Sequence, residues 1–305
     1  MLPGEDLQPG SAMLQPFDQL LKEILCRLSA PFGEARPSEK LGSEPQEADI
    51  VFFARWTPVE VSQELSLLAR MFSATCIVEG YHRTPGLDLV LGCMRKQLVL
   101  HHRLVQAEPE QTMPVPALWI LSAGKPKSAI EGLRYEQARD WPTGVYVGPQ
   151  PALPSWIVAI NELPMVPETL VWRLCGAERM LSQALLEMKS RSPESAVQRV
   201  VTEVIDRLEL DLGQQDDSTL TQEQKEFRMV SVEFYENHLR ETFHKGEVEG
   251  KATGKAEGVL TILATRGLSV TEAQRQRILG CTDLAQLELF LRRAISAAST
   301  EDVLS

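Results

Sequence analysis

The sequence predicts an α/β protein in which a central mixed sheet flanked by helices is followed by an all-helical C-terminal region. Three observations predict this. Short runs rich in β-branched and aromatic residues recur between residues 50 and 122, segments with helical periodicity separate them, and beyond Pro164 apolar residues recur at three- and four-residue steps. The apolar runs lack polar alternation, which is typical of strands buried on both faces.

The chain has 305 residues, 43% of them hydrophobic, with 31 Lys and Arg against 42 Asp and Glu and a net charge of −11. This hydrophobic fraction is enough to form a core, so disorder is excluded for most of the chain. The acidic balance argues against a protein that coats nucleic acid through its whole surface. Residues 194–245, however, hold 12 acids and 6 bases, a net charge of −6, so the N-terminal half is nearer to neutral and a local basic site is compatible with it.

Cysteine usage and the start of the chain indicate a cytoplasmic protein. The five cysteines lie far apart and form no C-x-x-C pair, as expected of reduced thiols. The first residues lack the basic and apolar stretches of a signal peptide. The longest uncharged run, residues 141–161, contains four prolines, so no membrane span is expected.

The predicted sheet follows an amphipathic helix that starts at Phe17 and is ended by Pro31 and Gly33. The polar stretch after this helix has room for one short edge strand, and the first buried strand contains residues 50–53. The remaining elements of this half are predicted to be, in order, a helix from Thr57 and Pro58 to Ser73, a strand at 74–81, a helix at 87–106, a strand at 115–124, a short helix at 128–133 and strands at 144–149 and 155–164.

The C-terminal half is predicted to be helical at 167–188, 195–212 and 221–243, with a linker at 213–222. Glycine then recurs every four residues, which costs a helix about 4 kcal/mol over four sites and suggests a partly helical spacer that self-associates. The final residues read as a pair of helices, with Thr271 and Thr282 as N-caps and Gly280 ending the first helix.

These elements suggest five regions along the chain: a disordered leader at 1–15, an α/β domain at 16–165, a helical region at 166–245, a glycine-repeat spacer at 246–266 and a helical hairpin at 267–305.

Two acids at the ends of neighbouring predicted strands form the candidate site. Asp49 begins one buried strand and Glu79 ends the next. If these strands pair, the two carboxylates are suited to hold Mg²⁺ or Mn²⁺, which activates water and neutralises charge on a phosphodiester. The alternatives are a turn or cap role for Asp49 and, for Glu79, a salt bridge to Arg83 or Arg95.

The N-terminal half resembles the PD-(D/E)XK, or restriction-endonuclease-like, superfamily, and more closely the Rpn group of recombination-promoting nucleases and putative transposases. The resemblance implies a metal-dependent DNA endonuclease in which Asp49 matches the Asp of the motif and Glu79 its second acid. It rests on the segments FDQLLKEIL, EADIVFF, CIVEGYHRTPG and CMRKQLVLHH and on the C-terminal tail with its glycine repeat and final helix pair.

The sequence departs from the family motif at Tyr81, where the family has Lys or Gln. Tyrosine does not supply a cation at neutral pH, so another residue must do so, and Lys96 on the following helix is the first candidate. Glu60 is a candidate third acid near the metal. The alternative for Lys96 is an ordinary solvated helix residue.

The segment from Tyr81 to Arg103 carries a net charge of +3 and three of the five histidines. We therefore expect a local DNA-binding patch made of His82, Arg83, Arg95 and Arg103. The leading hypothesis is a DNA endonuclease with Asp49, Glu79 and Lys96 as catalytic residues. One alternative is a catalytically degenerate nuclease fold that acts as an interaction protein and forms homo-oligomers through its C-terminal helices. Another is a nucleic-acid-binding module without cleavage.

Overall fold

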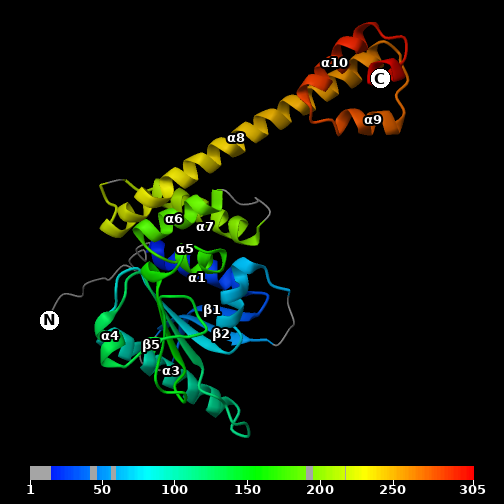
Figure 1. Cartoon of the computed structure of the whole chain (residues 1–305). Coiled ribbons are helices and arrows are strands. Elements are labelled where there is room, and N and C mark those ends of the chain that lie inside the picture. The colour runs from blue at the N-terminus through cyan, green and yellow to red at the C-terminus, as the bar shows by residue number, and fades with distance from the viewer. Residues whose placement is uncertain (1–14, 42–46, 56–59, 190–194, 217) are drawn as a thin grey trace, which may run out of the picture. The chain divides into compact units, whose positions relative to one another are not determined.

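A central sheet of seven strands confirms the α/β prediction. The structure is a computed structural model that describes residues 15–41, 47–55, 60–189, 195–216 and 218–305 (Figure 1). In spatial order the strands are β1 (Gly33–Lys40), β2 (Glu47–Ala54), β3 (Cys76–Tyr81), β4 (Ala117–Ser122), β7 (Ser155–Ala159), β6 (Val145–Val147) and β5 (Glu136–Gln137). The strands β3, β4 and β7 run parallel to one another and every other neighbouring pair is antiparallel, so the sheet is mixed.

Each central strand buries both of its faces because successive side chains point in opposite directions. On β4, Trp119 and Leu121 enter one core, whereas Leu118 and Ile120 enter the other. On β3, Val78 enters the same core as Trp119, whereas Ile77 enters the same core as Leu118. This explains why the central strands read in the sequence as unbroken apolar runs.

Helices cover both faces of the sheet (Figure 1). One core contains apolar residues of α1 (Pro16–Ser29), α2 (Ser66–Met71), α5 (Leu170–Leu174), α6 (Glu178–Lys189) and α7 (Ala196–Gly213). The opposite core contains those of α3 (Leu87–Ala107) and α4 (Lys127–Gly132). The crossover from β3 through α3 to β4 makes these two strands parallel neighbours. Short 3₁₀ helices occur at Gln63–Leu65, Ile160–Glu162 and Pro167–Thr169.

The chain divides into two units, Met1–Tyr235 and Glu236–Ser305, and this division differs from the predicted list of regions. Residues 166–235 belong with the sheet because α5, α6 and α7 pack into the same core as α1. The glycine repeat belongs with the C-terminal helices. It lies within α8 (Gln222–Thr265), which begins in the first unit and is helical throughout.

The second unit has its own core. Residues Ala252, Ala256, Val259 and Leu263 on one face of α8 pack with α9 (Glu272–Leu279), α10 (Leu284–Ser296) and α11 (Thr300–Leu304). This burial, rather than intrinsic helix propensity, explains why the glycine-rich segment is a continuous helix. No described helix is long and apolar enough to cross a membrane.

Two predicted helix starts need correction. The helix predicted from Thr57 and Pro58 begins as a 3₁₀ turn at Gln63 and continues as α2 from Ser66. Residues 56–59, which include the predicted start, lie outside the described part of the chain. Residues 1–14 of the predicted leader also lie outside it. The N-cap of α10 is Asp283, whose carboxylate accepts hydrogen bonds from two backbone N–H groups, and not Thr282. Thr271 caps α9 as predicted, with Gln274 completing a capping box.

The glycines of α8 offer a test of this packing. A Cβ added at Gly250 or Gly254 would meet no atom within 4 Å, whereas one at Gly258 would lie 3.3 Å from Leu291. Because alanine favours an exposed helix over glycine by about 1 kcal/mol, we expect Gly250→Ala and Gly254→Ala each to raise the free energy of unfolding of the second unit by roughly that amount. Urea denaturation of the full chain measures this, with Gly258→Ala as the crowded comparison. Destabilisation by the first two substitutions would contradict an open glycine face.

Candidate functional site

Asp49 and Glu79 lie opposite each other on neighbouring strands. The antiparallel register pairs Ile50 of β2 with Val78 of β3, which places Asp49 across from Glu79 at the next position. The Asp49 carboxylate reaches past this partner, and its Oδ2 accepts a hydrogen bond of 2.8 Å from the backbone N–H of Gly80. Asp49 therefore lies beside Glu79 near the carboxyl end of β3, because the two predicted strands are paired neighbours.

Lys96 joins the two acids from α3. Its Nζ lies 2.7 Å from Glu79 Oε2, and its side chain is 21% exposed, so it is not the solvated helix residue of the alternative interpretation. The helix turns it toward the sheet because Cys93, Gln97 and Leu100 on the same face are buried. Glu79 therefore pairs with Lys96, whereas the sequence alternative had proposed Arg83 or Arg95.

The Glu79 carboxyl is almost fully buried, with 2% of the residue exposed. Its second oxygen, Oε1, has no hydrogen-bond partner among the described residues. Burial is the largest cause that raises the pKa of Glu79, the charge of Asp49 raises it further, and Lys96 lowers it, with a resulting pKa of about 7. Glu79 therefore titrates near neutral pH.

A residue that the sequence reasoning missed, Lys22 of α1, neutralises Asp49 from the other side. Its Nζ lies 3.4 Å from Asp49 Oδ1 and 2.9 Å from the carboxylate of Asp18. The helix comes this close because Gly80 has no side chain, and a Cβ there would lie 2.4 Å from Leu21. The i,i+4 spacing of Asp18 and Lys22 was visible in the sequence, but nothing in it related the pair to Asp49.

Tyr81, at the position where the family motif has Lys or Gln, does not point its polar group at the acids. Its hydroxyl lies 3.2 Å from Cys93 Sγ. Burial is the main cause that raises the pKa of Tyr81 well above its usual value, so this hydroxyl stays protonated. The cation next to the acids is thus supplied by Lys96 from α3, with Lys22 on the side of α1.

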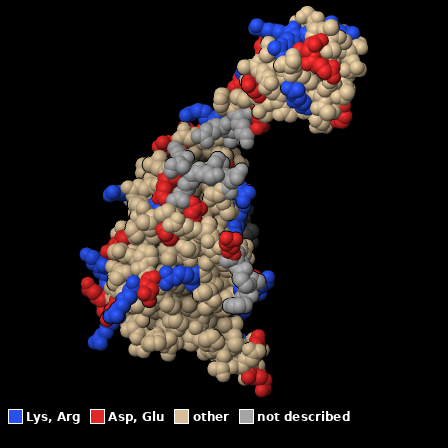
Figure 2. Space-filling model, turned by 45° about the vertical axis from the view of Figure 1, so that its right-hand side comes forward, with Lys and Arg blue, Asp and Glu red and all other residues tan. Residues whose placement is uncertain are grey.

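The four basic residues predicted to bind DNA have different surroundings. His82 stacks on the ring of Phe17 at 5.6 Å and lies 3.5 Å from a carboxylate oxygen of Glu223. Arg103 donates to the carbonyl of Lys40 at 2.8 Å and lies 3.5 Å from Glu39. Arg83 and Arg95 are exposed. Arg103 therefore has a structural contact with the end of β1, and on the face shown in Figure 2 basic and acidic side chains alternate over the first unit.

The donor chemistry at Asp49 and Glu79 fits a hard divalent cation. Mg²⁺ is commonly held by one or two carboxylates together with water and substrate phosphate. Glu79 Oε1 is a buried acceptor with no hydrogen-bond partner in the described part of the chain. Glu60, the predicted third acid, is exposed, and among the described residues no hydrogen bond or ion pair joins it to this pair. No group of three or more His, Cys, Asp or Glu side chains suited to a metal occurs in the described residues, so a cation at this pair would have two protein carboxylates as ligands.

The raised pKa of Glu79 predicts a pH-dependent stability. Between pH 4.5, where an ordinary glutamate ionises, and about 7, the folded chain holds a proton that the unfolded chain has lost. The stabilisation of the folded chain by this proton is fully present below pH 4.5 and is lost as the pH rises through 7. We therefore expect the free energy of unfolding of the wild type to fall relative to that of Glu79→Gln by roughly 3 kcal/mol over this range.

Urea denaturation in EDTA at several pH values measures this difference, with the exposed Glu131→Gln as a control that should follow the wild type. A difference between wild type and Glu79→Gln that stays constant with pH would contradict the assignment.

Comparisons of this chain with protein-family models, with curated proteins and with solved structures found no match. The site is therefore interpreted from its own geometry and chemistry.

Proposed function

We propose that this protein is a metal-dependent endonuclease that hydrolyses phosphodiester bonds in DNA, in the manner of the restriction-endonuclease-like Rpn nucleases that the sequence resembles. The observation that carries the proposal is the contact between Lys96 and Glu79, beside Asp49 at the carboxyl end of β3. In this proposal Lys96, from α3, supplies the positive charge that the motif lysine supplies in the family. The order of α1, β2, β3 and α3 also supports the proposal, because these elements, with the turn after β3, contain the four N-terminal segments on which the resemblance rests, whereas α2, between β2 and β3, lies outside those segments.

In this proposal Asp49 and Glu79 hold Mg²⁺ or Mn²⁺. Bound there, the ion would polarise the phosphoryl oxygens and lower the pKa of a coordinated water. Glu79 must be ionised to act as a ligand, and its pKa of about 7 makes cation binding favoured as the pH rises through neutrality. Lys22 must release Asp49 Oδ1, with which it is paired at 3.4 Å.

Lys96 holds the position from which a water or a phosphoryl oxygen can be oriented. Its ammonium group carries three N–H donors, and one of these is directed at Glu79 Oε2. In this proposal the other two donors stabilise negative charge that develops during attack. Tyr81 does not share this role, since its hydroxyl is directed to Cys93.

The proposal predicts that the purified protein nicks plasmid DNA with Mg²⁺ or Mn²⁺ and that Asp49→Asn, Glu79→Gln and Lys96→Ala each lower the rate by about 100-fold or more. Lys127→Ala, on the exposed surface of α4, is the matched control and should cut at the wild-type rate. A positive-control nuclease tests the conditions, and Asp49→Asn purified in parallel tests for contaminants. Intact plasmid with the wild type, or equal cleavage by all variants, would refute the proposal.

A second candidate is a catalytically degenerate nuclease fold that acts as an interaction protein. It is favoured by the engagement of both Asp49 oxygens, with Lys22 and with the Gly80 N–H, and by the burial of Glu79. Absence of cleavage together with concentration-dependent oligomers in light scattering, lost when the C-terminal helices are removed, would support it. The first proposal, a nuclease, also includes DNA as the substrate and the cytoplasm as the location of the protein.

A further inference from the structure

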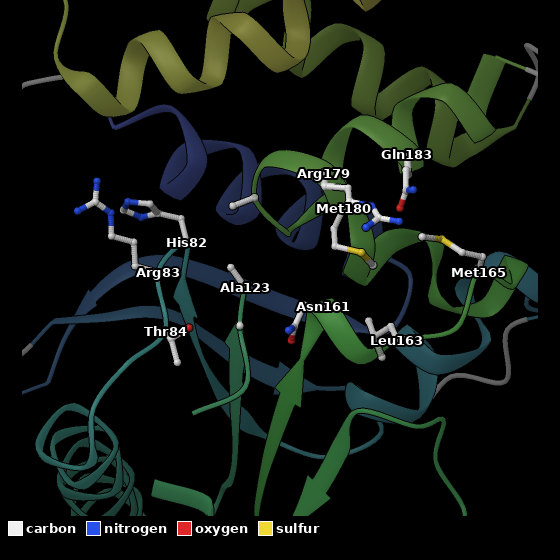
Figure 3. Close-up of a pocket in the computed structure, with 12 residues that line it drawn as sticks. His82, Arg83, Thr84, Ala123, Asn161, Leu163, Met165, Arg179, Met180 and Gln183 are labelled. Carbon is white, nitrogen blue, oxygen red and sulfur yellow. The ribbon is translucent and has the colours of Figure 1, made fainter. Parts of the chain in front are cut away.

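Next to the acids, a second concave site lies at the carboxyl ends of three parallel strands. The ends of β3, β4 and β7 form one side of a pocket of about 560 Å³, and the first turns of α6 form part of the opposite side (Figure 3). This volume is within the range of small-molecule sites, and crevices at the carboxyl ends of parallel strands commonly bind ligands. Asp49, Glu79 and Lys96 do not line it, so the pocket is separate from the two-carboxylate site.

The pocket is suited to an anion. Its described lining contains two arginines and no Asp or Glu, in a chain whose net charge is −11. Arg83 and Arg179 make no hydrogen bond or ion pair with other described side chains, whereas His82 in the same lining is engaged with Glu223. Arg179 belongs to the first turn of α6, whose N-terminal end carries partial positive charge. An unpaired guanidinium is well matched to the oxygens of a phosphate.

Neutral polar groups enter the pocket from both sides. In Figure 3 the Thr84 hydroxyl and the Asn161 amide lie at the strand ends, while Gln183 descends from α6 near Arg179. Gly124 leaves room for the Thr84 hydroxyl, since a Cβ there would lie 2.2 Å from it. Gln183 Oε1 is buried and has no hydrogen-bond partner among the described residues. A ligand N–H donor would satisfy this acceptor, whose isolation is otherwise unfavourable.

The remaining wall is apolar and adaptable. Leu163, Met165 and Met180 line the end of the pocket that holds Gln183 (Figure 3). Methionine side chains fit flat rings because they are flexible and polarisable. The pocket thus combines unpaired arginines, amide groups and an apolar surface for a ring.

We infer that this pocket binds one nucleotide unit. Its phosphate contacts Arg179 and the Thr84 hydroxyl with Arg83 at the rim, and its base lies against Met165 and Met180 with its N–H groups directed to Gln183. The unit comes either from a free mononucleotide or from an unstacked nucleotide of a DNA strand that also reaches the acids. Only the second source rests on the proposed nuclease function.

Isothermal titration calorimetry of the full chain in EDTA tests the inference without cleavage. The probes are the four deoxynucleoside 5′-monophosphates, inorganic phosphate, the four nucleosides and a short single-stranded DNA. We expect at least one monophosphate to bind about tenfold or more tightly than phosphate or its nucleoside, and Arg179→Gln to weaken it by about tenfold or more. Thr84→Val, which keeps the side-chain shape, should weaken the binding of this monophosphate less than Arg179→Gln does. Arg139 is an exposed arginine outside the pocket, so Arg139→Gln should bind the monophosphate as the wild type does.

Each result decides between the alternatives. If DNA binds and mononucleotides do not, and Arg179→Gln weakens the binding of DNA, the ligand is a nucleotide of a DNA strand. If mononucleotides bind and DNA does not, the ligand is a free nucleotide. No binding by any probe, equal binding of phosphate and nucleotide, or equal effects of Arg179→Gln and Arg139→Gln would overturn the inference. Asp49 does not line the pocket, so Asp49→Asn should keep the wild-type affinity for the nucleotide. Nucleotide binding without metal-dependent cleavage would therefore refute only the proposed nuclease function. Cleavage without nucleotide binding would refute only the proposed pocket ligand.

Discussion

A buried carboxylate must be paired or protonated, and this constraint shapes the candidate site around Glu79. Isolated charges are costly in a protein interior, and removing one partner of a buried ion pair typically costs about 3–5 kcal/mol. Glu79 meets the constraint in two ways, through the ammonium group of Lys96 and through a pKa raised to about 7. The pair also links α3 to β3, so the helix that carries the cation and the strand that carries the acid keep a fixed register. A carboxyl group that is 2% exposed, with one oxygen that accepts no hydrogen bond from a described residue, is costly to keep for stability alone. Perturbed carboxyls of this kind are concentrated at functional sites.

The same edge of the sheet brings together both sites proposed for this protein. Apolar residues dominate the central strands β3, β4 and β7, and the polar groups of the two proposed sites lie where these strands end. Glu79 and Gly80 at the end of β3 meet Asp49, and the loops after β3, β4 and β7 contribute Thr84, Gly124 and Asn161 to the pocket. Small residues make these approaches possible: Gly80 admits Leu21 of α1, and Gly124 admits the Thr84 hydroxyl. The two proposed sites therefore share β3.

Unbroken apolar runs in the sequence were sufficient to predict β2, β3 and β4 and the position of the two acids at strand ends, but not the two-residue strand β5. The choice of Lys96 came from the family resemblance, because Tyr81 stands where the motif has Lys or Gln. The missed features depend on contacts between distant segments. Lys22 reaches Asp49 only because α1 packs on Gly80, and Arg179 and Gln183 reach the strand ends only because α6 joins the same core. The continuity of α8 through its glycines likewise comes from burial of Ala252 and Ala256, which outweighs the propensity that suggested a spacer.

The central claim is that Asp49 and Glu79 form a cation site next to Lys96. Crystals of the full chain soaked in Mn²⁺ at a pH above 7, where Glu79 is ionised, test it through anomalous scattering. The account predicts an anomalous peak coordinated by both carboxylates, with Lys22 withdrawn from Asp49, and no peak in crystals of Glu79→Gln. A map with no peak at these residues, in which Lys22 and Lys96 keep their pairs with the two acids, would contradict it.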